Sequence, residues 1–162
     1  AASHLPLWAK LTPNTGEVPD VARAAEDGGA DALVVANTIL SMAIDIETRR
    51  PRLGNVMGGL SGPGLKPIAL RMAYQCARAS RLPVIGCGGI ATASDVLEYM
   101  IAGASAVQVG TATFIHPTAM LTIIDDLDTW LRARDISSVR DIIGTVADGE
   151  EDLASTMMAV AQ

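Results

Sequence analysis

The sequence has few aromatic residues, few cysteines and no excess of basic charge. Phenylalanine, tryptophan and tyrosine make up only 3% of the 162 residues, whereas hydrophobic residues of all kinds reach 49%. An apolar composition dominated by aliphatic side chains suits buried parallel strands covered by helices better than a β-sandwich or a propeller. The length fits one domain that buries a substantial core.

Basic residues are too few for a nucleic-acid surface. Twelve Lys and Arg stand against 18 Asp and Glu, which gives a net charge of −6 and a pI near 4.7. Nucleic-acid binding needs clustered cations that neutralise phosphates. No apolar run approaches the roughly 20 residues of a membrane span, and residues 1–6 do not have the charged and apolar regions of a signal peptide. We therefore expect a cytoplasmic protein that binds neither nucleic acid nor membranes.

Cysteine and histidine are too sparse to suggest a metal site. The two cysteines fit a reducing compartment, and no spacing typical of metal ligands occurs. We expect Cys76 to be a small core residue within a helix. Cys87 is expected to pack between its glycine neighbours, because no base adjoins its thiol. His116 is expected at the surface.

Short apolar runs alternate with stretches of helical periodicity along the chain. The apolar runs predict strands at 7–11, 32–35, 83–86 and 106–109. Helices are predicted over 18–27, 67–80, 92–103, 118–134 and 139–143, and the stretch from Thr92 to Asp95 resembles a capping box at the start of the third. Between the second strand and the second helix, a long loop from 37 to 65 holds five of the chain's 15 glycines. Loops of this length in a compact domain are usually functional.

Helices between successive strands predict a parallel sheet with right-handed crossovers. Four such βα units are half of an eight-stranded TIM barrel, (β/α)8, whose typical length is about 250 residues. We predict an α/β fold in which residues 1–144 form half of such a barrel. Residues 145–162 are a peripheral tail compatible with a helix. An open doubly wound sheet is the alternative, but no GxGxxG follows the first strand.

Two strand ends that carry glycine predict a phosphate site. Gly88 and Gly89 follow the third predicted strand, and Gly110 and Thr111 follow the fourth. Barrels often bind phosphate with the loops after their last two strands. Glycines let backbone N–H groups approach the oxygens, while a helix N-terminus and a threonine hydroxyl add to the attraction. The competing interpretation is that these glycines only make tight turns, but their matching positions favour phosphate.

Further polar residues stand on or near the predicted strands. Lys10 lies in an apolar strand, so it either reaches solvent or serves an anion inside the barrel, such as a flavin ring. Asn37 and Thr38 directly follow the second strand, where they either bind a planar polar ligand or cap the loop. The glycine-rich segment 58–64 is either backbone brought close to a ligand or a flexible lid.

Together these segments resemble the C-terminal half of the dihydroorotate dehydrogenases of class 1B, the NAD-linked type. The resemblance runs in order, without large gaps, from about Leu7 to Ile143. The flavin domain of dihydropyrimidine dehydrogenase is similar in this region. The matching stretches are AKLTPN at 9–14, ANT at 36–38, GGLSGP at 58–63, KPIALRM at 66–72, IGCGGI at 85–90, AGASAV at 102–107 and VGT at 109–111.

The resemblance implies both a reaction and a set of site residues. The reaction is the FMN-dependent oxidation of dihydroorotate to orotate in de novo pyrimidine (UMP) biosynthesis. Electrons would pass on to NAD through a partner subunit that carries FAD and an iron–sulfur cluster. The implied FMN contacts are Lys10, Ala36, Gly62, Gly88, Gly89, Gly110 and Thr111, and the implied substrate contacts are Asn37 and Thr38.

The resemblance also implies that the family's first four strands and its cysteine base lie upstream of Leu7. We therefore expect no catalytic base in this chain, and Cys87 does not match that motif. A half barrel leaves two sheet edges and an apolar face open. It should pair with the N-terminal half of the barrel or with a second copy, and meet an electron-transfer subunit. Two alternatives stay open: a phosphosugar isomerase, whose nearest acids would be Asp45 and Glu47, and a phosphate-binding half barrel with no activity alone.

Overall fold

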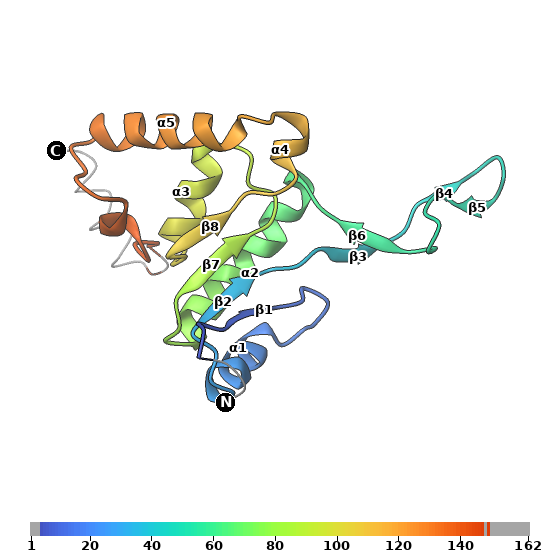
Figure 1. Cartoon of the computed structure of the whole chain (residues 1–162), viewed down its shortest axis with the longest axis horizontal. Helices are drawn as coiled ribbons and strands as arrows, with labels where there is room; N and C mark the ends of the chain where they lie inside the picture. The colour runs from blue at the N-terminus through green and yellow to red at the C-terminus, as the bar shows by residue number, and fades with distance from the viewer. Residues whose placement is uncertain (1–3, 148, 150–162) are drawn as a thin grey trace.

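A four-stranded parallel sheet lies at the centre of the molecule, and the computed structural model describes residues 4–147 and 149 (Figure 1). The strands stand in the order β1-β2-β7-β8. Their bounds are β1 Trp8–Lys10, β2 Ala32–Val35, β7 Val84–Cys87 and β8 Ala106–Gln108. The prediction of parallel strands joined by helices is confirmed, and the predicted strand ends differ from these bounds by one residue at most.

Helices cover one face of this sheet. Helices α1 and α2 pack against each other and against β2, α3 packs against β8, and α5 packs on α3. The helices are α1 Val18–Asp27, α2 Lys66–Ala79, α3 Ala93–Ile101, α4 Ala112–Ile115 and α5 Ala119–Arg132, with 3-10 turns η1 Pro63–Leu65 and η2 Val139–Ile142. Helix α4 was not predicted, because four residues are too few to show helical periodicity. The helix predicted over 139–143 is the 3-10 turn η2.

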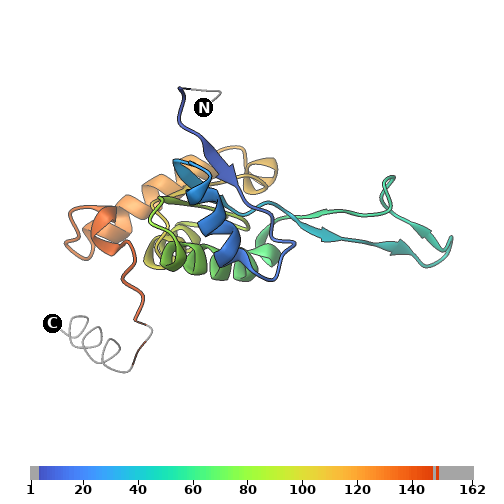
Figure 2. The same cartoon turned by 90° about the horizontal axis from the view of Figure 1, so that it is seen from below.

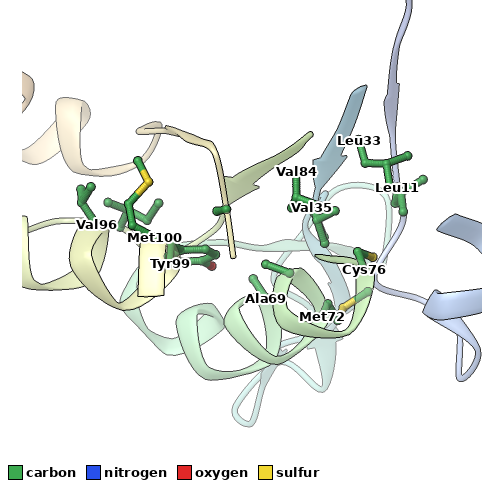
Figure 3. Close-up of a cluster of buried hydrophobic side chains, with 14 of the residues drawn as sticks. Leu11, Leu33, Val35, Ala69, Met72, Cys76, Val84, Val96, Tyr99 and Met100 are labelled. Carbon is green, nitrogen blue, oxygen red and sulfur yellow. The ribbon is translucent and has the colours of Figure 1, made fainter. Parts of the chain in front are cut away.

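The main core lies between the sheet and helices α2 and α3 (Figure 3). Side chains alternate along a strand, so Leu33 and Val35 of β2 enter this core. A smaller cluster on the opposite face of the sheet consists of Ala32, Val34 and Ile85. Cys76 of α2 is fully buried, as predicted, and burial raises the pKa of its thiol to about 11.

Tyr99 of α3 connects this core to the turn after β7. Its ring fills the space beside Gly86, where an added Cβ would lie 2.3 Å from the ring atom Cδ1. Its hydroxyl donates a hydrogen bond to the carbonyl of Gly88 at 2.8 Å. Burial raises the pKa of Tyr99 above its usual value, so the hydroxyl keeps the proton that it donates. One buried side chain thus explains a glycine within β7 and holds the backbone that follows it.

Residues 39–60 form a protruding arm, not the loop predicted from the sequence (Figure 2). Near the body, β3 (Ile39–Ser41) pairs antiparallel with β6 (Gly58–Leu60), and farther out β4 (Ile44–Asp45) pairs with β5 (Arg50–Pro51). Local periodicity misses such a hairpin, because each strand is very short and its partner is distant in sequence. The exposed large apolar side chains of the arm are Leu40, Met42, Ile44, Ile46, Leu53, Val56, Met57 and Leu60.

The C-terminal tail predicted over 145–162 lies outside the described residues, apart from 145–147 and 149. At the start of this segment, the Thr145 hydroxyl donates a hydrogen bond to the carbonyl of Ile142 at 2.8 Å. Among the helices that the structure describes, none combines the length and the apolar character needed to cross a membrane.

The contact between Tyr99 and Gly86 yields a prediction about stability. Gly86→Ala should lower the free energy of unfolding by about 1–3 kcal/mol, because the added methyl group forces the ring out of its position. The measurement is urea unfolding followed by circular dichroism. Gly54→Ala is the matched control, since an added Cβ there meets nothing within 4 Å, and its effect should stay within about 0.5 kcal/mol. Equal stability of the two variants would contradict this account of the packing.

Candidate functional site

The carboxyl ends of the four parallel strands meet at one edge of the sheet, where a cavity of about 190 Å³ opens. Parallel pairing places every strand-to-helix connection at this edge, which is where α/β barrels bind ligands. All the site residues predicted from the sequence line this one cavity: Lys10, Ala36, Asn37, Thr38, Gly62, Gly88, Gly89, Gly110 and Thr111. The structure therefore brings together residues from five separate segments, while their individual roles stay predictions.

Among the residues that the structure describes, those along the cavity wall include one cation and no carboxylate. Lys10 is the only charged residue among those that the structure places along this wall, and its Nζ lies 3.8 Å from Sγ of Cys87. Asp45 and Glu47, the acids considered for an isomerase, lie on the arm and do not line the cavity. Such a lining suits an anionic ligand and offers no pair of carboxylates for acid–base catalysis.

Gly88 and Gly89 have reasons to be glycine within the fold itself. Both have positive φ angles, of +143° and +71°. An added Cβ would lie 2.8 Å from Cβ of Ala69 at the first position, and 2.6 Å from the backbone nitrogen of Lys66 at the second. The turn after β7 therefore lies directly against the first turns of α2. Tight packing accounts for these two glycines without a ligand.

Gly110 differs, because neither its conformation nor its packing requires glycine. Its φ is not positive, and an added Cβ would meet nothing within 4 Å. The residue lines the cavity and precedes Thr111 and the short helix α4. Barrels form phosphate sites from the loops after their last two strands together with the N-terminus of a short extra helix. The open space at Gly110 fits backbone that a ligand approaches closely.

The end of the arm contributes to the same cavity. Gly62 has a φ of +86° and is buried. Next to it, the hydroxyl of Ser61 accepts a hydrogen bond from the hydroxyl of Thr111 at 3.0 Å. The sequence reasoning missed Ser61 and Gln108, which also line the cavity. Two signals could have found them: Ser61 lies within the glycine-rich segment, and Gln108 interrupts an apolar strand.

A second cavity, of about 230 Å³, adjoins the first through Asn37 and Thr38, which line both. Oδ1 of Asn37 accepts a hydrogen bond from the backbone N–H of Thr38 at 2.8 Å. The lining of the second cavity is polar for the most part: Thr12, Asn14, Asn37, Thr38, Leu40 and Gly59. The two residues predicted to contact substrate thus stand between the two hollows.

An ion-pair cluster links α2 to α3 next to the turn after β7. Nζ of Lys66 lies 2.7 Å from Oδ1 of Asp95 and 2.7 Å from Oε1 of Glu98, which ties α2 to α3. The hydrogen bonds that Lys66 donates to Asp95 and then to Glu98 raise the pKa of Lys66. Burial raises the pKa of Asp95, but hydrogen bonds from Lys66 and from the backbone N–H groups of Ala91 and Thr92 outweigh burial and hold that pKa below its usual value. Asp95 also completes the capping box predicted at the start of α3.

These features define a partial α/β barrel with a cavity at its strand ends that carries one lysine, and known proteins identify its family. The model of the dihydroorotate dehydrogenase family matches residues 1–131. A Trichlorobacter lovleyi protein named dihydroorotate dehydrogenase B (NAD(+)), catalytic subunit, is 52% identical over 90% of this chain and 48% of its own length. A Solibacter usitatus protein provisionally named dihydroorotate dehydrogenase A (fumarate) is 56% identical over 87% of this chain and 46% of its own length. The chain belongs to the dihydroorotate dehydrogenase family.

A solved structure supports the same assignment. The crystal structure of DHODH from Eimeria tenella in complex with ferulenol is 31% identical and superposes with a TM-score of 0.72, covering 86% of this chain and 38% of the other. The chain spans about half the length of the curated relatives it matches. The predicted partial TIM barrel and the predicted family are confirmed, and the doubly wound sheet and the isomerase are wrong.

The cluster around Asp95 yields a prediction about pH. Because the folded-state pKa lies below the ordinary value of 3.8, these bonds stabilise the fold above that value, and the stabilisation is lost as the pH falls through the lower folded pKa. Asp95→Asn should therefore lower the free energy of unfolding near neutral pH. The difference in this free energy between the wild type and the variant should become smaller as the pH falls from about 6 to about 2. The measurement is urea unfolding at a series of pH values. The exposed Asp126→Asn is the control, and a deficit independent of pH would contradict the assignment.

Proposed function

We propose that this chain supplies the phosphate end of an FMN site and part of the substrate site of an enzyme that oxidises dihydroorotate to orotate, a step of UMP biosynthesis. The observation that carries the proposal is the single cavity lined by all nine residues that the family resemblance singles out. Their convergence at the strand ends is what a shared ligand requires.

The cavity suits the phosphate of FMN in its chemistry. Gly110 leaves free space at a strand end, Gly62, Gly88 and Gly89 line the cavity without a side chain, and Thr111 brings a hydroxyl. Backbone N–H groups and hydroxyls are donors that bind phosphate oxygens. The volume of about 190 Å³ lies below the roughly 300–1,000 Å³ of typical ligand sites. This chain would accordingly hold part of the cofactor.

Lys10 and Ala36 would contact the isoalloxazine ring. FMN, when bound, would supply the hydride acceptor of the reaction. An ammonium group in this place stabilises negative charge on a reduced ring, and a group fixed in advance has little reorganisation to undergo during the reaction. Cys87, 3.8 Å from Nζ of Lys10, limits where the ammonium group can lie. The small side chain of Ala36 is buried at the cavity wall, which leaves room for a planar ring.

Asn37 and Thr38 would hold the substrate. Dihydroorotate and orotate carry ring amide groups and a carboxylate, which an amide and a hydroxyl can bind by hydrogen bonds. Both side chains are exposed at the junction of the two cavities. The base that removes the substrate proton is proposed to lie outside this chain, in the N-terminal half of the barrel. Residues 1–144 would then be the C-terminal half of one FMN-binding domain.

The partners proposed are the N-terminal half of the barrel, a second copy of the protein and an electron-transfer subunit with FAD and an iron–sulfur cluster. Support comes from the relative named as the catalytic subunit of an NAD(+)-linked enzyme, and from β1 and β8, which stand at the two ends of the sheet order. The Solibacter usitatus relative is named for fumarate. The electron acceptor is therefore tested directly, with NAD(+) and with fumarate. A cytoplasmic location is part of the proposal.

The test uses the protein that carries this chain, at the full length its gene encodes. It should purify with FMN or bind added FMN, seen as quenching of flavin fluorescence, and dihydroorotate without oxygen should bleach the flavin and yield orotate. NAD(+) and fumarate are then supplied in turn as oxidants. A full-length protein that binds no FMN, or a flavoprotein that dihydroorotate leaves oxidised, would disprove the proposal. Residues 1–162 alone should show no turnover.

Gly110→Ala tests the phosphate site. The added methyl group meets no protein atom, so stability should change by less than about 0.5 kcal/mol. The dissociation constant for FMN should nevertheless rise about tenfold or more, equivalent to about 1.4 kcal/mol. Gly64→Ala is the matched control, because Gly64 has equal free space but does not line the cavity. Unchanged FMN affinity in Gly110→Ala would show that Gly110 does not contribute to the phosphate site.

Lys10→Gln tests the role of the cation. The substitution keeps length and polarity but removes the charge, so the rate at which dihydroorotate reduces the flavin should fall by about 10² or more. Stopped-flow absorbance measures this rate, and the FMN content of each variant corrects for lost cofactor. Arg52→Gln, which removes an exposed charge on the arm, should reduce at the wild-type rate. A wild-type rate in Lys10→Gln would show that this cation does not act on the flavin.

A further inference from the structure

Asn14 connects the loop after β1 to the first strand of the arm. Its Oδ1 accepts a hydrogen bond from the backbone N–H of Leu40 at 2.9 Å, and its Nδ2 lies 3.5 Å from the carbonyl oxygen of Thr38. These two backbone groups flank Ile39, so one carboxamide meets the backbone as a neighbouring strand would. The side chain thereby fixes the direction in which the chain leaves Thr38.

The loop that carries Asn14 is itself held firmly. The hydroxyl of Thr12 accepts hydrogen bonds from the backbone N–H of Asn14 at 3.2 Å and from its Nδ2 at 3.1 Å. The neighbouring Leu11 is buried, and its carbonyl accepts a hydrogen bond from the backbone N–H of Asn37 at 2.9 Å. The segment from Leu11 to Asn14 therefore contacts the backbone on both sides of the proposed substrate residues.

Thr38 is confined from its other side by the returning strand of the arm. An added Cβ at Gly59 would lie 2.1 Å from Oγ1 of Thr38, so the threonine side chain rests directly on the glycine backbone. Gly59 belongs to β6, which pairs with β3 opposite Leu40. Asn14 on one edge of β3 and Gly59 on the other thus leave Thr38 little freedom.

From this geometry we propose that Asn14 is a positioning residue for substrate. It sets the hydroxyl of Thr38 and the carboxamide of Asn37 at the junction of the two cavities, and it acts through them without touching the reacting atoms. Asn14 lines the second cavity together with these two residues. Its effect should therefore be on the binding of a ligand in that cavity. The inference deepens the proposed function and rests on it, because it presumes that Asn37 and Thr38 bind dihydroorotate and orotate.

A positioning role differs from a general structural role in what it changes. Asn14→Ala removes the contacts to Thr38 and Leu40, so the KM for dihydroorotate and the dissociation constant for orotate should rise about tenfold, a typical loss for one well-formed hydrogen bond. FMN affinity should change less than twofold, because no predicted FMN contact bonds to Asn14. Asn55→Ala, the same change in an exposed arm residue, should leave every one of these quantities at its wild-type value.

The experiment is a double-mutant cycle in the full-length protein, with orotate as the probe and Thr38→Val as the second substitution. If Asn14 acts through Thr38, Asn14→Ala should weaken orotate binding about tenfold in the wild-type background but less than threefold in Thr38→Val. Equal losses in both backgrounds, or no loss in either, would overturn the proposal. Asn14→Asp keeps an acceptor for Leu40 but loses the donor to Thr38. This variant replaces Asn14→Ala in the test if Asn14→Ala fails to fold. Wild-type orotate affinity in Asn14→Asp would then contradict the positioning role.

The outcomes separate this inference from the proposal beneath it. A wild-type protein without FMN binding or dihydroorotate oxidation defeats the proposed function, and the role of Asn14 falls with it. A wild-type protein that oxidises dihydroorotate while Asn14→Ala keeps its KM defeats the role of Asn14 alone.

Discussion

Parallel pairing of β1, β2, β7 and β8 is the constraint on which the site depends. It aligns four strands so that Lys10, the residues after Val35, and the turns before α3 and α4 all emerge at one edge. A single antiparallel strand in this sheet would carry its polar residues to the opposite edge and divide the cavity. The helices on one face preserve this order, because each covers the strands that it joins. The direction of the strands, more than any single contact, thus determines where the cavity lies.

The site has two kinds of parts, and they differ in how tightly the fold constrains them. The turn after β7 is held by packing on α2, by the hydroxyl of Tyr99 and by the ion pairs around Lys66. The end of β8 is open, and Gly110 contacts nothing that would demand a glycine. The fold thus constrains one wall of the cavity closely and leaves the other wall open.

Local pattern was enough to predict the features that depend on neighbours in sequence. The fully buried β2 is an uninterrupted apolar run, and the capping box of Thr92 and Asp95 lies within four consecutive residues. The nine predicted site residues lie in stretches that resemble the family, and this resemblance is what predicts them. Other features depend on partners far along the chain. The arm needs Ile39 to meet Leu60, and Lys66 finds Asp95 only once α2 and α3 have packed, so neither could be predicted from spacing.

The arm begins and ends at the site, and this has a consequence for how such a protein can diverge. Its first residues adjoin Thr38, and its last lead into Ser61, which Thr111 holds. Near the body the hairpin is fixed by β3, β6 and Asn14, whereas its outer portion, from Met42 to Met57, has apolar side chains that face solvent. Under the proposed function, the base and the tip of this one hairpin would be under different selection. The tip would vary with the surface that it meets while the base stays constant for the ligand, so association and chemistry would evolve separately within about twenty residues of chain.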